Sequence, residues 1–113
     1  MHELGIVFHI IRELKEVCAQ YDIKEIKKLT LEIGEVSSIV PSYLADCYKW
    51  AIQKEDFLKN SSLEIQVIEG INHCEDCGMD YSATKFGKIC PNCKSEHTYL
   101  LQGNESNIKS IEV

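Results

Sequence analysis

The chain has 113 residues, which is enough for one compact core or for a small core with a satellite module, but not for two domains of ordinary size. Its 44% hydrophobic and 27% charged residues are typical of a folded protein and exclude the disordered and collagen-like classes. Eighteen acidic against twelve basic residues give a net charge of -6, which disfavours nucleic acid and anionic membranes as partners.

Two further features indicate where the chain works. It has no run of about 18 apolar residues to span a bilayer, and its start lacks the basic region and apolar core of a secretory signal. We therefore expect a cytoplasmic protein without a membrane partner. Because cytosolic thiols are kept reduced, its six cysteines indicate metal ligands and buried thiols rather than disulfides.

Residues 3–21 have the spacing of an amphipathic helix. Apolar residues recur at intervals of three and four, while charged residues fall on the other side. The apolar stripe consists of Leu4, Val7, Ile11, Leu14, Cys18 and Tyr21. Because Cys18 lies on this stripe, we assign it to the core rather than to a metal site.

A strand and a second helix follow. Residues 26–33 place Leu29, Leu31 and Ile33 on one face, the period-two pattern of a half-buried strand that ends at Gly34. Pro41 fits the first turn of a helix, where its missing N–H is not needed. The apolar side of that helix is predicted to consist of Leu44, Cys47, Tyr48 and Ala51, so Cys47 is also assigned to the core.

The rest of the chain predicts an insertion. Residues 62–69 alternate as a second strand, and residues 107–113 return to strand-like composition. Residues 70–104 between them are rich in Gly, Asn, Cys and Asp and have no sustained period. We therefore expect an α/β fold in which two helices pack on a three-stranded sheet (residues 1–69 with 105–113), with a zinc-ribbon-like domain inserted at residues 70–104.

The inserted segment carries a metal-ligand pattern. "CEDC" (Cys74, Cys77) and "CPNC" (Cys90, Cys93) are two C-x2-C pairs separated by 12 residues. Each pair can turn so that both sulfurs aim at one point, and two pairs supply a tetrahedral shell for Zn(II). Since such a shell has no open position, the zinc is predicted to be structural. A rubredoxin-like iron site and a redox dithiol are the alternatives.

Two histidines flank these pairs. His73 directly precedes Cys74, and His97 follows Cys93 by four residues. They are interpreted as exposed loop residues or as hydrogen-bond donors to sulfur. The alternative hypothesis is that one of them replaces a cysteine ligand under acidic conditions.

The opening "MHEL" raises a second metal hypothesis. A large residue at position 2 is expected to preserve Met1, so that its amine lies beside the imidazole of His2. These two nitrogens, with the His2 amide and either the amide or the carboxylate of Glu3, can form a planar set that suits Ni(II) or Cu(II) better than Zn(II). Chemistry alone leaves open the alternative that His2 is an exposed residue at a frayed terminus.

The order of motifs along the chain resembles the HypA/HybF family of hydrogenase maturation factors. The resemblance rests on "MHEL", "LEIGEVS" followed by "VP", "LEIQVIEG", "CEDCG" with "CPNC", and "QGNE" before a final strand. It implies a nickel metallochaperone rather than an enzyme. It also implies Ni(II) bound by Met1, His2 and Glu3, and Zn(II) bound by Cys74, Cys77, Cys90 and Cys93. The stretch "SSIVPSY" carries no carboxylate that could add an acidic ligand.

The resemblance also implies partners. These are a GTPase accessory protein for nickel insertion, the large subunit of a [NiFe]-hydrogenase and, as a further client, the urease maturation proteins. Monomer and homodimer are both compatible with the sequence.

Two other functional classes also use paired cysteines. A zinc-ribbon nucleic-acid binder is disfavoured because Lys85, Lys88 and Lys94 are balanced by acidic residues in the same segment. An electron-transfer iron protein would be red on purification.

Overall fold

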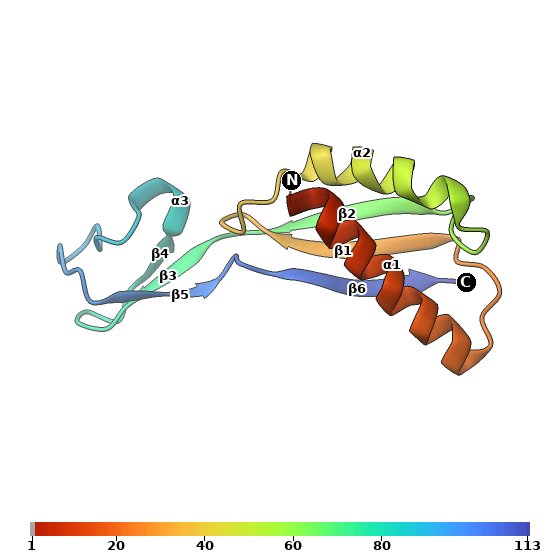
Figure 1. The fold of residues 1–113 in the computed structure, drawn as a ribbon. Helices are drawn as coiled ribbons and strands as arrows, with labels where there is room; N and C mark the ends of the chain where they lie inside the picture. The colour runs from red at the N-terminus through yellow and green to blue at the C-terminus, as the bar shows by residue number, and fades with distance from the viewer. Residues whose placement is uncertain (1) are drawn as a thin grey trace. The chain divides into compact units, whose positions relative to one another are not determined.

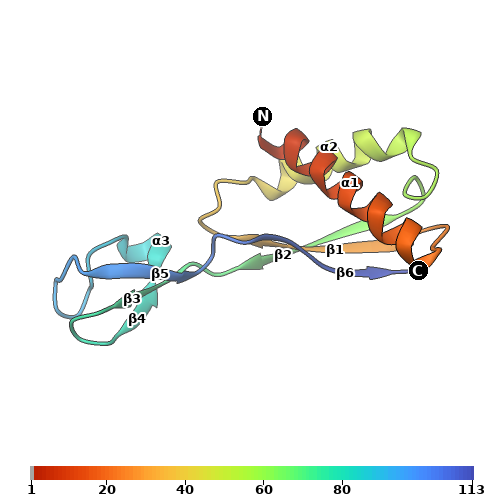
Figure 2. The same cartoon turned by 60° about the horizontal axis from the view of Figure 1, so that its bottom comes forward.

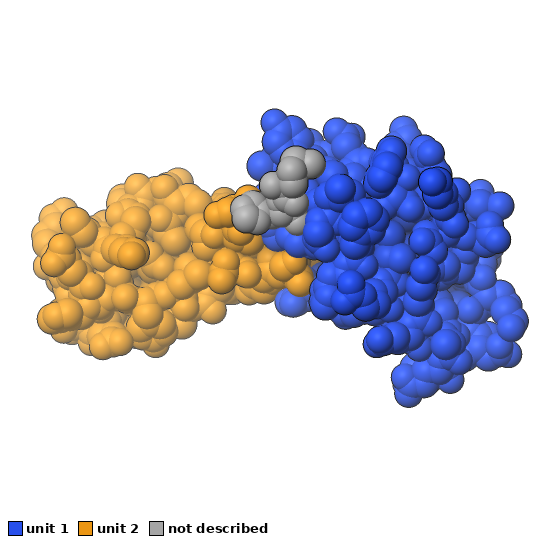
Figure 3. Space-filling model, viewed as in Figure 1, with its two compact units in different colours: residues 1–31, 39–66, 107–113 blue, residues 32–38, 67–106 orange. Residues whose placement is uncertain are grey.

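The computed structural model describes residues 2–113, with side chains from residue 3 onward. The chain forms two compact units (Figure 3). The first contains residues up to 31, Ile39–Gln66 and Asn107–Val113, and the second contains Glu32–Ser38 and Val67–Ser106. The expected α/β class is confirmed, with helices and two separate three-stranded sheets.

Helix α1 (His2–Tyr21) supplies one wall of the core of the first unit. Its buried stripe consists of Val7, Ile10, Ile11, Leu14 and Cys18. The stripe ends one turn earlier than predicted, and Tyr21 is exposed. The helix closes at this point, because Asp22 has φ 53° and the N–H of Ile23 donates to the carbonyl of Cys18 at 2.9 Å.

No helix in the described part of the chain combines the length and hydropathy of a membrane span.

Strands β1 (Lys28–Gly34), β2 (Ser62–Ile68) and β6 (Ser106–Glu112) form a sheet in the order β2-β1-β6 (Figure 1). The C-terminal strand therefore rejoins the first sheet, as the sequence predicted. Two views place α1 and α2 over the same face (Figure 2). The apolar residues of the central strand are at most 1% exposed: Leu29, Leu31 and Ile33. The sheet and the helices enclose one core.

Helix α2 (Pro41–Ala51) begins directly after its N-cap residue Val40, and a short 3-10 helix η1 (Ile52–Lys54) follows it. Leu44 and Tyr48 point into the core, as predicted. Cys47 does not: it is half-buried and lines a shallow groove with Leu4, Asp46 and Trp50. Leu44 and Tyr48 are four residues apart and share one side of the helix. Cys47 directly precedes Tyr48 and is rotated by about 100° from it, so it falls at the edge of the buried face.

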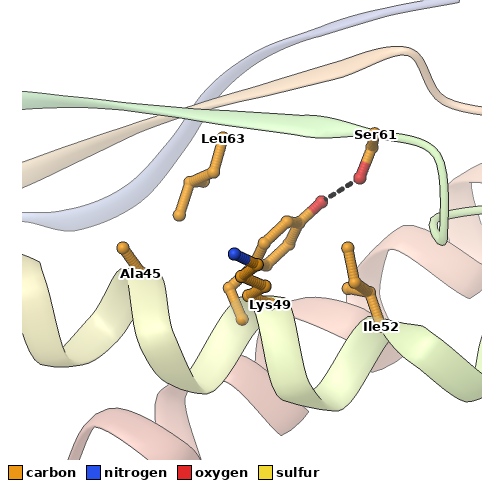
Figure 4. Close-up of a pocket in the computed structure, with 6 residues that line it drawn as sticks. Ala45, Lys49, Ile52, Ser61 and Leu63 are labelled. Carbon is orange, nitrogen blue, oxygen red and sulfur yellow. Dashed lines mark hydrogen bonds between the residues drawn. The ribbon is translucent and has the colours of Figure 1, made fainter.

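The Tyr48 hydroxyl meets a partner despite its burial. It lies 2.5 Å from Ser61 Oγ, which donates to the carbonyl of Leu58 at 2.6 Å. Figure 4 shows this bond beside a small pocket between α2 and β2. Because the chain of hydrogen bonds is complete, the buried hydroxyl has no unpaired polar atom to offer a ligand.

The second unit is a smaller sheet with one helical turn. Strands β3 (Ile71–Cys74), β4 (Asp80–Ser82) and β5 (Thr98–Gln102) pair antiparallel in the order β4-β3-β5, and α3 (Ala83–Phe86) follows β4. Its buried apolar cluster consists of only Cys74, Tyr81 and Cys90. A buried cluster this small is typical of modules that a bound metal stabilises.

Close backbone packing holds the segment 32–38 in the second unit. The N–H of Glu35 donates to the carbonyl of Ile68, and that of Val36 to the carbonyl of Gly103, each at 2.8 Å. A Cβ at Gly34 would lie 1.9 Å from the carbonyl oxygen of Gly103. Only glycine therefore allows this approach.

Candidate metal centres

The four predicted zinc ligands converge. The sulfurs of Cys74, Cys77, Cys90 and Cys93 all lie within 4.8 Å of one another, and they form the only such group of three or more metal-ligating side chains among the described residues. Two of the distances are 3.5 Å (Cys74 to Cys93) and 3.6 Å (Cys77 to Cys90). A tetrahedral Zn(II) with bonds of about 2.3 Å places its sulfurs about 3.8 Å apart, so the cluster fits this ion.

The first cysteine pair lies in a tight turn. The N–H of Gly78 donates to the carbonyl of Cys74 at 2.9 Å, and the N–H of Cys74 donates to the carbonyl of Met79 at 2.9 Å. Gly78 has φ 77°, the left-handed conformation that glycine adopts without cost. The turn directs Cys77 back toward Cys74.

The second pair repeats this turn. The N–H of Lys94 donates to the carbonyl of Cys90 at 2.9 Å, and the N–H of Cys90 donates to the carbonyl of Ser95 at 3.0 Å. Lys94 occupies the place of Gly78 with φ 65°. A lysine is strained in this conformation, whereas the glycine of the first turn is not.

Exchanging residue types at these matched positions is expected to have opposite effects. Gly78→Ala should lower the free energy of unfolding of the zinc-loaded protein by about 1–2 kcal/mol, and Lys94→Gly should raise it by up to about 1 kcal/mol. A Cβ at Gly78 would meet no atom within 4 Å, so the penalty is one of backbone conformation. Thermal unfolding measures both; a loss of stability in Lys94→Gly would contradict the equivalence of the two turns.

The environment of the thiols favours a bound cation. Hydrogen bonds from the backbone of Met79 and the side chain of Asn92 lower the pKa of Cys77 to about 6. The backbone N–H of Ser95 lowers the pKa of Cys93, but desolvation and the three neighbouring thiols outweigh it and raise this pKa to about 12. Four sulfurs this close cannot all be negative without a positive charge between them. Zn(II) supplies that charge and deprotonates its ligands.

The chemistry of the site follows from its closed shell. Four thiolates leave a zinc ion no open position for water or substrate, so the ion would cross-link the two turns rather than catalyse a reaction. Cys74 and Cys90 are fully buried, whereas Cys77 and Cys93 are exposed. The first cysteine of each pair thus joins the core of the unit, and the second closes the site at its surface.

Neither histidine of this unit lies within the sulfur cluster. His73 Nδ1 is 2.6 Å from Asp80 Oδ1 on the neighbouring strand. His97 Nδ1 is 3.0 Å from Asp76 Oδ2. Both rings therefore contact carboxylates, and not sulfur, among the described residues. His97 is an exposed loop residue, as interpreted, whereas His73 lies in β3 and is half-buried, so that interpretation is wrong for His73.

Asp76 adds a link that the sequence analysis missed. Its carboxylate accepts hydrogen bonds from Ser95 Oγ and from His97, and these bonds lower the pKa of Asp76. Asp76 lies inside the first cysteine pair, and Ser95 follows the second. The contact ties the two turns together independently of the metal, but nothing in the spacing of these residues signals it.

The predicted nickel ligands are described only in part. Met1 lies outside the described residues, as does the side chain of His2, whose backbone begins α1. Glu3 is 8% exposed, and its Oε2 accepts a hydrogen bond from the N–H of Val40 at 3.2 Å. The Glu3 carboxylate therefore joins the first turn of α1 to the start of α2. Nickel binding by these three residues stays a prediction.

Comparisons with known proteins agree with this architecture. A family model described as "Hydrogenase/urease nickel incorporation, metallochaperone, hypA" matches residues 1–113. The hydrogenase maturation factor HypA of Trichodesmium erythraeum is 35% identical over 113 residues, which are 100% of this chain and 96% of the relative. That of Trichormus variabilis is 36% identical over 113 residues, with the same coverage.

Solved structures show the same fold. The solution structure of the Ni metallochaperone HypA from Helicobacter pylori has a TM-score of 0.72 at 22% identity, and the alignment covers 97% of this chain and 95% of that one. A second structure, titled "Solution structure of HypA protein", has a TM-score of 0.72 at 24% identity. The alignment covers 99% of this chain and 95% of the chain in that structure.

Proposed function

This chain belongs to the HypA family of metallochaperones for nickel incorporation into hydrogenase and urease, and on that premise we propose that it binds Ni(II) at its N-terminus and delivers it to the large subunit of a [NiFe]-hydrogenase. The observation that carries the proposal is the full-length family match in a chain that begins Met-His-Glu. The ion is cargo, so the protein acts by ligand exchange and not as an enzyme.

Three nitrogen donors near the terminus make the proposed site suitable for nickel. The amine of Met1 and the imidazole of His2 can chelate one ion near neutral pH. The amide between them can complete a planar set, which is the geometry that Ni(II) accepts and tetrahedral Zn(II) does not. Amide N–H groups of the first turn are not used by the hydrogen-bond ladder of a helix, so a metal can take one without unwinding α1.

The Glu3 contact supports a defined position for this site. Because its carboxylate binds the N–H of Val40, the first turn of α1 is fixed against the start of α2. We assign the Glu3 side chain to this positioning role. The amide of Glu3 then remains the donor that could provide a fourth nitrogen.

The zinc unit has a separate role in this proposal. Its closed shell of Cys74, Cys77, Cys90 and Cys93 holds a rigid module that can present a surface to a partner. Transfer of nickel to the client is assigned to ligand exchange, and the GTPase accessory protein would supply the free energy that drives it. Such an exchange is expected in the cytoplasm, where the thiols remain reduced.

The experiment is a transfer assay. Zinc-loaded protein with an authentic N-terminus is titrated with Ni(II) by calorimetry, then mixed with the nickel-free large subunit, the GTPase and GTP. We expect tight binding of Ni(II) and its appearance in the large subunit, faster than from nickel sulfate buffered to the same free concentration. A chain that binds no nickel tightly, or that slows the delivery, would refute the proposal. Nickel-free urease in place of the hydrogenase subunit tests the second client.

A further inference from the structure

The exposed face of α1 holds two metal-ligating side chains in contact. His9 Nε2 lies 2.6 Å from Glu13 Oε1, and the two residues are separated by one helical turn. Their side chains are 65% and 49% exposed. Neither the zinc cluster nor the N-terminal residues include them, and the core does not need them.

Their geometry is that of a helical chelate. Residues at i and i+4 lie on the same side of a helix, an arrangement that zinc enzymes use for pairs of ligands from one helix. A metal with bonds of about 2.1 Å places two adjacent donor atoms about 3 Å apart. The donors of His9 and Glu13 need to separate by only a few tenths of an ångström to accept an ion, and two exposed side chains can do so by small rotations.

The pair also lies close to the start of the helix. His2 precedes His9 by seven residues, so its backbone lies about 10 Å from that of His9 along the axis of α1. Gly5 lies between them in the sequence, and a Cβ there would meet no described atom within 4 Å.

From these observations we propose that His9 and Glu13 form a second site on α1 for Ni(II), weaker than the N-terminal one. One imidazole nitrogen and one carboxylate oxygen bind the ion, and water completes its shell. When Nε2 carries a proton, the ion displaces it to solvent. The ligand class is a divalent transition-metal ion that accepts both imidazole and carboxylate, so Cu(II) also binds there.

A weak Ni(II) site in this position could help to load the proposed N-terminal site. Two protein donors and several exchangeable waters allow the ion to enter and leave rapidly. An ion released about 10 Å from the N-terminus can bind there before it diffuses into bulk solvent. The His9–Glu13 site would thus capture nickel and pass it along the helix to the amine and His2.

The test removes the N-terminal site first. In zinc-loaded His2→Ala protein with an acetylated N-terminus, both the amine of Met1 and the imidazole of His2 are lost as ligands, so the remaining Ni(II) binding reports other sites. We expect weak binding that His9→Gln and Glu13→Gln each reduce at least fivefold, while Glu16→Gln, an exposed carboxylate on the same helix, leaves it within twofold. In NMR spectra, paramagnetic Ni(II) should broaden the ring signals of His9 before those of His73 and His97.

Equal weak binding by all these variants, or broadening of His73 or His97 before His9, would overturn the proposal. The outcome is separate from that of the nickel-chaperone proposal. The acetylated His2→Ala protein tests the second site whether or not the unmodified N-terminus binds nickel tightly.

Discussion

Replacing Cys90 with serine is expected to cost the protein its zinc and the fold of its second unit. Cys90 is fully buried and is one of three residues in the unit's apolar cluster. If about 10–16 kcal/mol of zinc binding is divided among four ligands, the loss of one lowers the affinity by about 3 kcal/mol, roughly a hundredfold. The remaining core is too small to hold the unit together without the ion.

Zinc content and NMR together measure this result. Cys90→Ser should contain less than one zinc per chain after dialysis against a chelator, and the amide signals of residues 71–102 should collapse toward random-coil positions. Cys47→Ser is the matched control, because Cys47 is half-buried in the first unit and lies outside the sulfur cluster. It should retain its zinc. A zinc-replete Cys90→Ser protein with dispersed signals would show that the site is not the stabilising element of the unit.

The first unit should persist when the zinc is removed. Its core residues, among them Leu14, Leu29 and Leu44, are at most 1% exposed and make no use of the metal. Signals of α1 and α2 should therefore keep their positions in Cys90→Ser. The loss of zinc is therefore expected to unfold the second unit and to leave α1 in place.

Periodic elements could be predicted from the sequence because their burial follows from local geometry. The spacing of three and four along α1 and the alternation along β1 each assign a buried face without reference to the rest of the chain. The exceptions lie at the edges of such faces. Tyr21 is exposed because the helix closes at that residue, and Cys47 is half-buried because it is offset from the core-facing side of α2.

Contacts at the candidate sites could likewise be predicted only where they depend on local sequence. The cluster of four cysteines could be predicted because each C-x2-C pair forms its own turn, and only the meeting of two turns had to be inferred. Contacts between distant residues gave no such signal. Asp76 reaches Ser95 across 19 positions, and Glu3 reaches Val40 across 37. Both contacts depend on how the elements pack, which no local pattern encodes.

Blocking the N-terminus is expected to abolish tight nickel binding, with the zinc left in place. Acetylation removes the amine of Met1 as a ligand, and His2→Ala removes the imidazole. Each change should lower the Ni(II) affinity by at least about a hundredfold, because a chelate that loses one donor also loses the ring that donor closed. Calorimetry measures the affinity. Glu16→Ala, which changes an exposed carboxylate on the same helix, should bind nickel like the unmodified chain.

Two substitutions of Glu3 distinguish a positioning role of its side chain from a role as a nickel ligand. In Glu3→Gln the side-chain oxygen can still accept the N–H of Val40, so we expect nickel affinity within about threefold of the unmodified chain. In Glu3→Ala that part-buried N–H loses its acceptor, which should lower the free energy of unfolding of the first unit by about 1–3 kcal/mol. If Glu3→Gln instead loses nickel as completely as His2→Ala does, the carboxylate is itself a ligand. Its contact with Val40 would then have to break whenever the cargo is bound, which would couple nickel loading to the start of α2.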